Sequence, residues 1–487
     1  MASVSATQND QATSAYEGAS RPQVLFPKDA EYQQRIESYW SNTAKQRPAS
    51  IVRPASSEEL AEALVALVKG GKPFSVRSGG HCPSPGANNL EGGVVIDLGL
   101  FNQVVLDNDK PGTVQVGTAC TWSGVYGELQ KHNLGAAGGR AGTVGVGGLT
   151  LGGGNTWFTA QKGWACDNML EAEVVLADGQ IVRASRSEHA DLFRALKGGS
   201  NNFGIVTRFT LATIPLEKVW GGVLVLPKET IPSVCRLTTE FTTKIPENPD
   251  NNLIIVIGYI PDMKDVVASA AVVNTKAVSN DPIFDDWKKL PAIADSTKNT
   301  SIYELSFEVT LPENYYSSWF TLTFKNDERI MAKASELHDR LVASLQGFVP
   351  EGDFMSQCIF QPLPTTFAQH SVMQGGNVLG LEDNETDGIL FQTIVMMKTE
   401  EQHKFAYPLL KAGVQELKEF AASIDGGLFR WLYMNYADKS QDVIASYGEK
   451  NIKLMKEVAS KYDPDGVFQR LCPGGWKLPR AVHEAES

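Results

Sequence analysis

Residues 77–86 read RSGGHCPSPG, so that His81 directly follows two glycines. Glycine reaches positive φ angles without strain and lets the backbone approach a ligand closely. An imidazole acts as a nucleophile, a base or a metal ligand near neutral pH. The segment alone leaves four roles open for His81: metal ligand, base, covalent attachment point or structural residue.

The densest glycine segment lies further along the chain, at residues 135–155, GAAGGRAGTVGVGGLTLGGGN. Its glycine content predicts an irregular conformation rather than a regular helix or strand. The chain contains no GxxxxGK-[ST] string, which excludes a P-loop. Gly145 and Gly147 begin a GxGxxG pattern that the following residues do not complete, which excludes a Rossmann site.

Two separate glycine loops, at 78–80 and 138–154, can converge on one long polyanionic cofactor. Backbone N–H groups exposed in such loops form concave sites for anions, and Thr143 adds a hydroxyl donor. The structural alternative is that both segments are tight turns in a sheet-rich domain. Residue types alone leave both explanations open.

The composition is that of a globular protein with an ample core, because 42% of the 487 residues are hydrophobic and 21% are charged. At about 100–200 residues per domain, the length predicts two or three domains. A net charge of −12 argues against a nucleic-acid partner. The N-terminus resembles no secretory signal and no run of about 18 apolar residues occurs, so we expect a cytoplasmic protein without a membrane span. The six cysteines form no CxxC pair, which argues against zinc and predicts reduced, mostly buried thiols.

The first half of the chain alternates short strands, hairpins and helices. Ser56 and Glu59 form a capping box before an apolar stripe, which predicts a helix that ends at Gly70. An Asp-Gly pair predicts the turn of a hairpin over 171–185. Periodicity and turn residues predict further strands at 73–78, 92–98 and 203–216, a hairpin at 104–117, and helices at 122–132 and 189–199.

The composition changes near Leu216, where glycine becomes rarer and amphipathic segments begin. Residues 1–25 are polar and without periodicity, which predicts a disordered segment. Residues 441–468 predict a long helix followed by an Asp-Pro-Asp-Gly turn. Between residues 216 and 441, strands are predicted at 223–226, 252–260 and 387–398, and helices at 231–243, 329–346 and 406–422.

Six motifs follow one another along the chain: RSGGH, GTVGVGGLTLGGG, KGWACDNMLEAEVVLADG, LFRALKGGSNNFGIVT, YMNYAD and KYDPDGVFQ. In this order they resemble the berberine-bridge-enzyme-like family of FAD-linked oxidoreductases, in the vanillyl-alcohol-oxidase superfamily. The resemblance implies an α+β fold: a PCMH-type FAD-binding domain with an inserted substrate domain built on an antiparallel sheet flanked by helices. The implied boundaries are 1–25 for the disordered N-terminus, 26–215 for the first FAD-binding segment, 216–430 for the substrate-binding domain, and 431–487 for a C-terminal segment that returns to the FAD-binding domain.

The resemblance also implies FAD bonded covalently through His81 to the 8α-methyl group of the flavin. Many family members form a second link through a cysteine just before TVGVGG, but Ala141 stands at that position, so we expect a single link. Cys82 is adjacent to His81 and cannot easily face a different edge of the ring. The implied cofactor contacts are Arg77, Ser78, Gly79, Gly80, His81, Thr143, Val144, Gly145, Gly147, Gly153, Asn168, Gly204, Ile205, Val206 and Asn435.

The same resemblance points to catalytic residues. Val144 is placed beside the oxygen-reactive face of the flavin, where a small side chain is associated with access for O2. Tyr433 is the implied catalytic base, and Gln392 could stabilise its tyrosinate, since a phenol with a pKa of about 10 needs help to act as a base at neutral pH. Glu308 and His370 are further candidates, and ordinary packing is the alternative for each residue.

The implied function is an oxidase of the kind found among intracellular fungal enzymes of secondary metabolism. It would remove hydride from a small organic substrate, in some members with oxidative ring closure, and pass the electrons to O2 to give H2O2. Two alternatives stay open: a dehydrogenase that uses a non-oxygen acceptor, and a non-redox cyclase that keeps the flavin as structure. The expected partners are the small-molecule substrate and O2, with no nucleic acid and no membrane, and the sequence does not define the oligomeric state.

Overall fold

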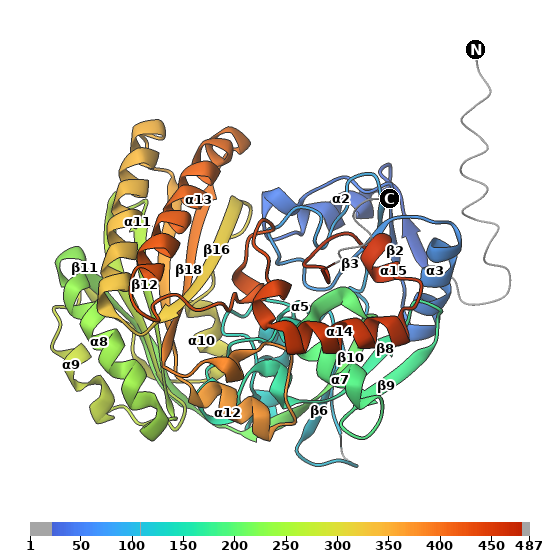
Figure 1. The fold of residues 1–487 in the computed structure, drawn as a ribbon, viewed down its shortest axis with the longest axis horizontal. Coiled ribbons are helices and arrows are strands. Elements are labelled where there is room, and N and C mark those ends of the chain that lie inside the picture. Colours follow the sequence, from blue (N-terminus) through green and yellow to red (C-terminus); the bar gives the residue numbers. More distant parts are fainter. Residues whose placement is uncertain (1–21, 108, 480–487) are drawn as a thin grey trace.

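The computed structural model describes residues 22–107 and 109–479, which form three β-sheets with helices packed around them (Figure 1). This mixed architecture confirms the predicted α+β class. Most of the predicted disordered segment, residues 1–21, lies outside the described residues. Its last part was wrongly assigned, because Gln23–Leu25 form strand β1, which pairs with β2 through backbone hydrogen bonds.

The first sheet has four strands in the order β1-β2-β4-β3. Strands β2 (Ser50–Arg53), β4 (Val94–Asp97) and β3 (Phe74–Arg77) run parallel to one another. Helix α3 (Ser57–Lys69) connects β2 to β3, and the Ser56 hydroxyl accepts a hydrogen bond from the Glu59 N–H, as the capping box predicts. Because β3 ends at Arg77, the glycine turn with His81 begins directly at the edge of this sheet.

The second sheet contains both predicted hairpins. Strand β10 (Ile205–Pro215) lies at its centre and pairs with β6 on one side and β8 on the other. Helices α4 (Trp122–Leu129) and α7 (Ala190–Gly199) confirm the two helices predicted in this region. The remaining strands are β5 (Val104–Leu106), β6 (Thr113–Gly117), β7 (Leu134–Ala136), β8 (Met169–Val175) and β9 (Ile181–Ser185).

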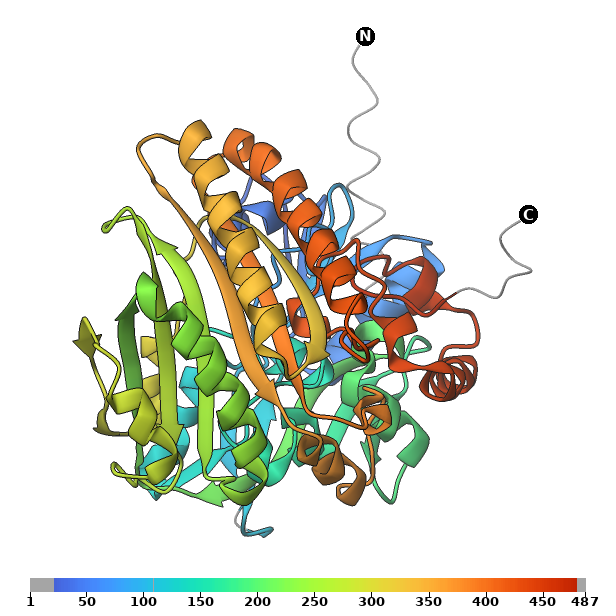
Figure 2. The same cartoon turned by 60° about the vertical axis from the view of Figure 1, so that its left-hand side comes forward.

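The third sheet is antiparallel and has eight strands. Helices α8 (Ile231–Lys244), α11 (Glu328–Phe348) and α13 (Glu400–Ala422) cover its outer face (Figure 2). The opposite face is turned toward the first two sheets. The strands are β11 (Val219–Pro227), β12 (Asn251–Ile260), β13 (Asp265–Asn274), β14 (Ala294–Asp295), β15 (Lys298–Thr300), β16 (Tyr316–Lys325), β17 (Phe354–Leu363) and β18 (Gly388–Met397).

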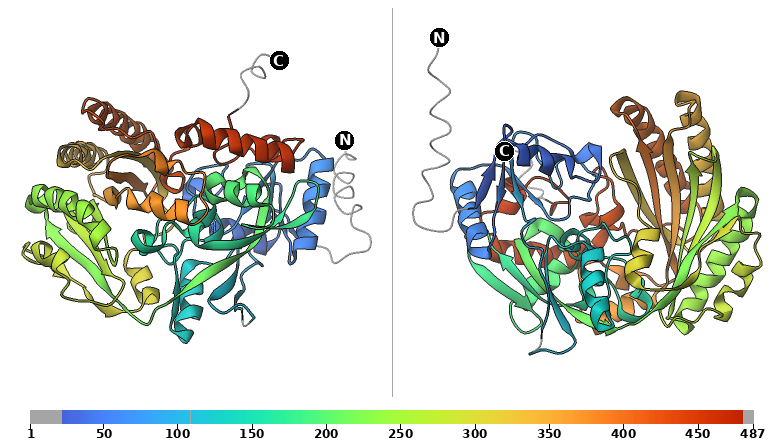
Figure 3. Two further views of the ribbon diagram at one scale, coloured as in Figure 1. Left: turned by 60° about the horizontal axis from the view of Figure 1, so that its bottom comes forward. Right: turned by 180° about the vertical axis from the view of Figure 1, so that it is seen from behind.

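The chain changes from the second sheet to the third between Pro215 and Val219, at the boundary predicted near residue 216. After α13 it returns to the N-terminal half, where α14 (Glu449–Tyr462) packs against α7 (Figure 3). The division into independent domains stays a prediction. Among helices of the described residues, none has the length and apolar character needed to cross a bilayer.

Two local predictions were wrong. The glycine-rich segment contains helix α5 (Val146–Leu151), whose buried side chains pack against the surrounding structure and override the low helix propensity of glycine. The long C-terminal helix begins only at Glu449, because Gly448 adopts a φ of 85° that no helix continues through. A short 3-10 turn, Ile444–Tyr447, precedes this glycine.

Glycines 138 and 139 pack against the buried indole ring of Trp122. A Cβ at either position would overlap that ring, so part of the glycine-rich segment is needed for packing rather than for a ligand. The indole in turn fills the space between α4 and the loop. A close-packed interior has little room for an added methyl group.

We expect Gly138→Ala to lower the free energy of unfolding by about 1–3 kcal/mol, because the methyl group must displace the Trp122 ring. Gly413→Ala in α13 is the matched control, since its new Cβ would meet no atom within 4 Å. That control should raise the stability by up to about 1 kcal/mol. Denaturant unfolding measures both, and equal midpoints for Gly138→Ala and wild type would contradict the packing argument.

Candidate active site

A cavity of about 580 Å³ lies between the two glycine loops and the inner face of the large sheet. Its volume is in the range of cofactor and ligand sites in proteins. On β17, residues 355, 357, 359 and 361 line it in alternation, as expected for one face of a strand. The predicted site residues that line the cavity are Ser78, Gly79, Gly80, His81, Val144, Gly145, Gly147, Gly204, Ile205, Val206, Gln392, Tyr433 and Asn435.

The two glycine loops touch each other backbone to backbone. A Cβ placed on Gly79 would lie 2.6 Å from the Gly145 Cα, and one on Gly145 would lie 2.7 Å from the Gly79 Cα. Neither residue has a positive φ, so it is this close approach that requires glycine at both positions. The contact brings residues 78–81 and 144–148 to one wall of the cavity.

The wall formed by the first loop carries free hydrogen-bond donors. Within the described residues, the backbone N–H groups of Gly79, Gly80 and His81 have no acceptor. Buried backbone donors are nearly always paired in folded proteins. Consecutive N–H groups that face a cavity form an anion site, so this wall fits the phosphates of a dinucleotide.

His81 is held in a defined position on the same wall. Its ring stacks on Trp40 with a centroid distance of 4.6 Å and an interplanar angle of 16°. Its Nε2 lies 3.5 Å from the Thr143 hydroxyl oxygen, which orients the ring. Burial lowers the pKa of His81 to about 4, because the charged form loses its hydration. The imidazole is therefore neutral at physiological pH and has a free electron pair.

Three neighbouring residues bear on attachment and access. Ala141 lines the cavity and offers no thiol for the second link that the resemblance places at this position. Cys82 also lines the cavity, but burial raises the pKa of its thiol and so disfavours the reactive thiolate. Val144 lies on the wall, and its backbone carbonyl oxygen accepts a hydrogen bond from the backbone N–H of Trp122 at 3.0 Å.

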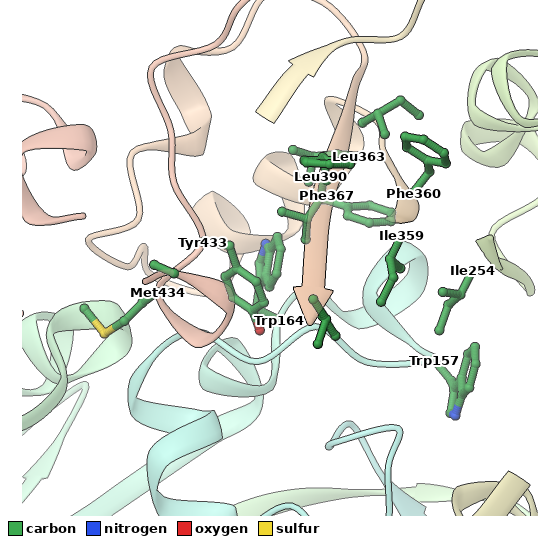
Figure 4. Close-up of a cluster of buried hydrophobic side chains, with 14 of the residues drawn as sticks. Trp157, Trp164, Ile254, Ile359, Phe360, Leu363, Phe367, Leu390, Tyr433 and Met434 are labelled. Atoms are coloured by element: carbon green, nitrogen blue, oxygen red, sulfur yellow. The ribbon is translucent and has the colours of Figure 1, made fainter. Parts of the chain in front are cut away.

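Tyr433 lines the cavity and packs against Trp164 (Figure 4). Its hydroxyl oxygen accepts the backbone N–H of Asn155 at 2.7 Å and the side-chain amide of Asn435 at 3.1 Å. Burial is the dominant effect and raises the pKa of Tyr433. Gln392 lines the cavity but makes no hydrogen bond to Tyr433 in the described structure, whereas Asn155 and Asn435 do.

A polar cluster that the sequence analysis missed adjoins this tyrosine. The Arg140 guanidinium donates from Nη2 to the Gln361 side-chain oxygen at 2.6 Å and to the Tyr436 hydroxyl at 2.7 Å. Asn155 donates to the same Gln361 oxygen at 3.0 Å. The sequence carried one signal for this cluster. Arg140 stands inside a glycine-rich segment, where few other side chains are available to form a polar site.

Several predicted residues do not line the cavity. Arg77 donates to the carbonyl oxygens of Arg35 and Ser38 and lies over the Tyr39 ring. The Asn168 amide donates to two backbone carbonyls in its own turn. Thr143 and Gly153 are likewise not among the lining residues, and His370 contacts the Ala160 carbonyl oxygen at 2.8 Å. Glu308, by contrast, does line the cavity from the end of α10 (Ile302–Glu308).

The arrangement of free backbone donors under a sheet fits a nucleotide cofactor. The described residues contain no cluster of His, Cys, Asp and Glu side chains that could hold a metal ion. Residues 48–185 match the family model of an FAD-binding domain. An FAD-dependent monooxygenase of Aspergillus calidoustus is 35% identical to the chain over 96% of the chain and 90% of that protein.

Solved structures agree with this match. Berberine bridge enzyme, as a C166A variant, superposes with a TM-score of 0.75 at 17% identity, over 96% of this chain and 98% of that one. A glucooligosaccharide oxidase of Acremonium strictum, described with 6-S-cysteinyl, 8α-N1-histidyl FAD, gives a TM-score of 0.72 at 18% identity, over 94% and 96%. The chain belongs to the family of this FAD-dependent monooxygenase and has the fold of berberine bridge enzyme, which confirms the resemblance, the fold class and FAD as the cofactor.

We expect Gly79→Ala to weaken FAD binding at least about tenfold, because the new methyl group forces the two loops apart and misplaces the free N–H groups. Gly124→Ala in α4 is the control, since its Cβ would meet nothing closer than 3.4 Å. The flavin content of the purified proteins measures the effect. Full flavin content in Gly79→Ala would show that the contact does not shape the site.

Proposed function

We propose that the protein is an FAD-dependent oxidase that removes hydride from a small organic substrate and is reoxidised by O2. The observation that carries the proposal is the shared cavity: free backbone donors and His81 form one wall, and aliphatic residues of the large sheet form the opposite wall. Bound FAD would accept two electrons from a substrate carbon and transfer them to O2. The apolar wall excludes water and holds the substrate against the cofactor.

His81 is the proposed covalent attachment point. A neutral, stacked imidazole on the cavity wall is ready to act as a nucleophile without first losing a proton. The histidyl link in the glucooligosaccharide oxidase supports the proposal. That enzyme also carries a cysteinyl link, for which Ala141 provides no thiol here, so we propose a single link.

Proton removal from the substrate needs an acceptor in the cavity. Tyr433 remains the proposed acceptor, and the donors from Asn155 and Asn435 favour its tyrosinate. Burial opposes this by raising its pKa. Glu308 is the alternative, because it is the carboxylate that lines the cavity within the described residues. A side chain in this role typically contributes about 10²–10⁴-fold to the rate.

The relative from Aspergillus calidoustus is named a monooxygenase, and this name favours monooxygenation as a second candidate reaction. Both reactions require O2 to reach the reduced cofactor, and they differ in whether an oxygen atom enters the product. An oxidase releases one H2O2 for each substrate oxidised, whereas a monooxygenase transfers oxygen from ¹⁸O2 to the product. The dehydrogenase and the non-redox cyclase remain the alternatives in which O2 plays no part.

One prediction concerns the covalent attachment of the flavin to His81. Acid precipitation of the wild type should leave the flavin in the pellet, and His81→Ala should release all of it. Because the pKa of His81 is lowered to about 4, its neutral form persists down to pH 5.5, and the rate of flavin attachment to apoprotein should hold between pH 8 and 5.5. A histidine of ordinary pKa would lose about tenfold of its neutral form over this range. Flavin free in the wild-type supernatant would rule out the link.

A further prediction tests the proposed oxidase reaction. Substrate added without O2 should bleach the flavin, and air should restore its colour with stoichiometric H2O2. Val144→Leu should slow reoxidation much more than reduction, because a longer side chain on the cavity wall would narrow the space through which O2 reaches the cofactor. Stopped-flow absorbance measures both half-reactions. Reduced wild-type flavin that persists in air for minutes would favour the dehydrogenase, and the absence of bleaching would favour the non-redox cyclase.

A further inference from the structure

Arg140 is a buried cation without an anionic partner. Its side chain lines the cavity, and the residue is only 8% exposed. No carboxylate of the described residues lies within ion-pairing distance of its guanidinium. The carboxylate on the cavity wall, Glu308, pairs instead with Lys298 at 3.3 Å. An arginine stays charged at any physiological pH, so this positive charge is uncompensated within the protein.

The hydrogen bonds of Arg140 use only part of its donors. Nη2 donates one hydrogen to Gln361 and the other to Tyr436. The Nε hydrogen and both Nη1 hydrogens have no acceptor among the described residues. Nε and Nη1 are not fully buried, and Arg140 lines the cavity, so these two nitrogens are open to it. Three N–H donors, which point from different edges of the planar guanidinium fork, are therefore available to a ligand.

The guanidinium is held firmly on the side of the large sheet. Gln361 belongs to β17, and its own amide donates to the Tyr436 hydroxyl at 3.2 Å. The Trp157 ring lies 5.6 Å from the guanidinium carbon. Arg140 is thus oriented by partners from the sheet and the C-terminal segment, whereas the free N–H groups suited to phosphates belong to residues 79–81.

A buried charge is costly unless a partner compensates it. The sheet that holds Gln361 also presents aliphatic side chains to the cavity, including Ile254, Val256 and Ile359, alongside the amides of Gln357 and Gln392. We infer that the substrate is a largely apolar organic acid whose carboxylate or enolate oxygens bind the free donors of Arg140. The inference rests on the proposed function, because it assigns this part of the cavity to substrate.

Such a pairing would fix the substrate at one end. Because both Nη2 hydrogens are used, the free Nε and Nη1 hydrogens do not lie side by side, and each of these nitrogens binds one oxygen of a carboxylate or a conjugated enolate, which sets the position of that oxygen. The aliphatic wall would hold the rest of the molecule. Esters, amides and ethers of the same acid would leave the arginine unpaired and would bind more weakly.

The test uses the oxidised holoenzyme and two probes of equal shape, benzoate and benzamide. Binding is followed by the change in the flavin absorbance spectrum. Benzoate should saturate the site below about 100 mM, and Arg140→Met should raise its dissociation constant at least about tenfold. The affinity for benzamide should change by less than about twofold in the same variant, which also reports an intact cavity. Arg140→Lys should recover part of the benzoate affinity, because it keeps the charge without the fork.

Arg186→Met removes an exposed arginine outside the cavity and controls for net charge. For an enolate, 1,3-cyclohexanedione replaces benzoate and cyclohexanone replaces benzamide. Equal benzoate affinity in wild type and Arg140→Met, or no saturation with either anion, would overturn the inference. A shift in the flavin midpoint potential of Arg140→Met with unchanged anion binding would overturn it as well, and would assign the charge to the cofactor. None of these measurements requires turnover, so failure of the proposed oxidase reaction is a separate result.

Discussion

The contact between the backbones of Gly79 and Gly145 is the constraint on which the site depends. It joins the turn after β3 to the loop before α5, two segments that belong to different sheets. Any side chain at either position would separate them, and the free N–H groups would then no longer face the same space as Val144. The glycines are therefore needed because they let the two loops come into contact, in addition to allowing tight turns.

The second requirement is closure of the large sheet over these loops. The polar cluster of Arg140, Asn155, Gln361, Tyr433 and Tyr436 draws on the glycine segment, β17 and the C-terminal segment. It can form only when all three meet. The same enclosure explains the electrostatics, because burial lowers the pKa of His81 and raises that of Tyr433. The same loss of water keeps one imidazole neutral and opposes ionisation of one phenol, whereas the donors from Asn155 and Asn435 favour that ionisation.

Local sequence patterns determined much of the secondary structure. The capping box at Ser56, the Asp-Gly turn between β8 and β9, and the alternation in β10 each produce the element they predict, because caps, turns and side-chain periods act over a few residues. The ordered series of motifs also determined the family and the cofactor. Helix α5 and the start of α14 failed these rules, since buried packing and one glycine φ decided them.

The sequence by itself determined which glycine segments line the cavity and that His81 stands among them. Only the tertiary structure decided that Arg77 and Asn168 bind backbone carbonyls, that Asn155 and Asn435 rather than Gln392 contact Tyr433, and that Arg140 faces the cavity without a carboxylate. The physical reason is that hydrogen-bond partners and desolvation depend on residues far apart in the chain. Spacing along the sequence does not encode which side chains meet across a closed cavity.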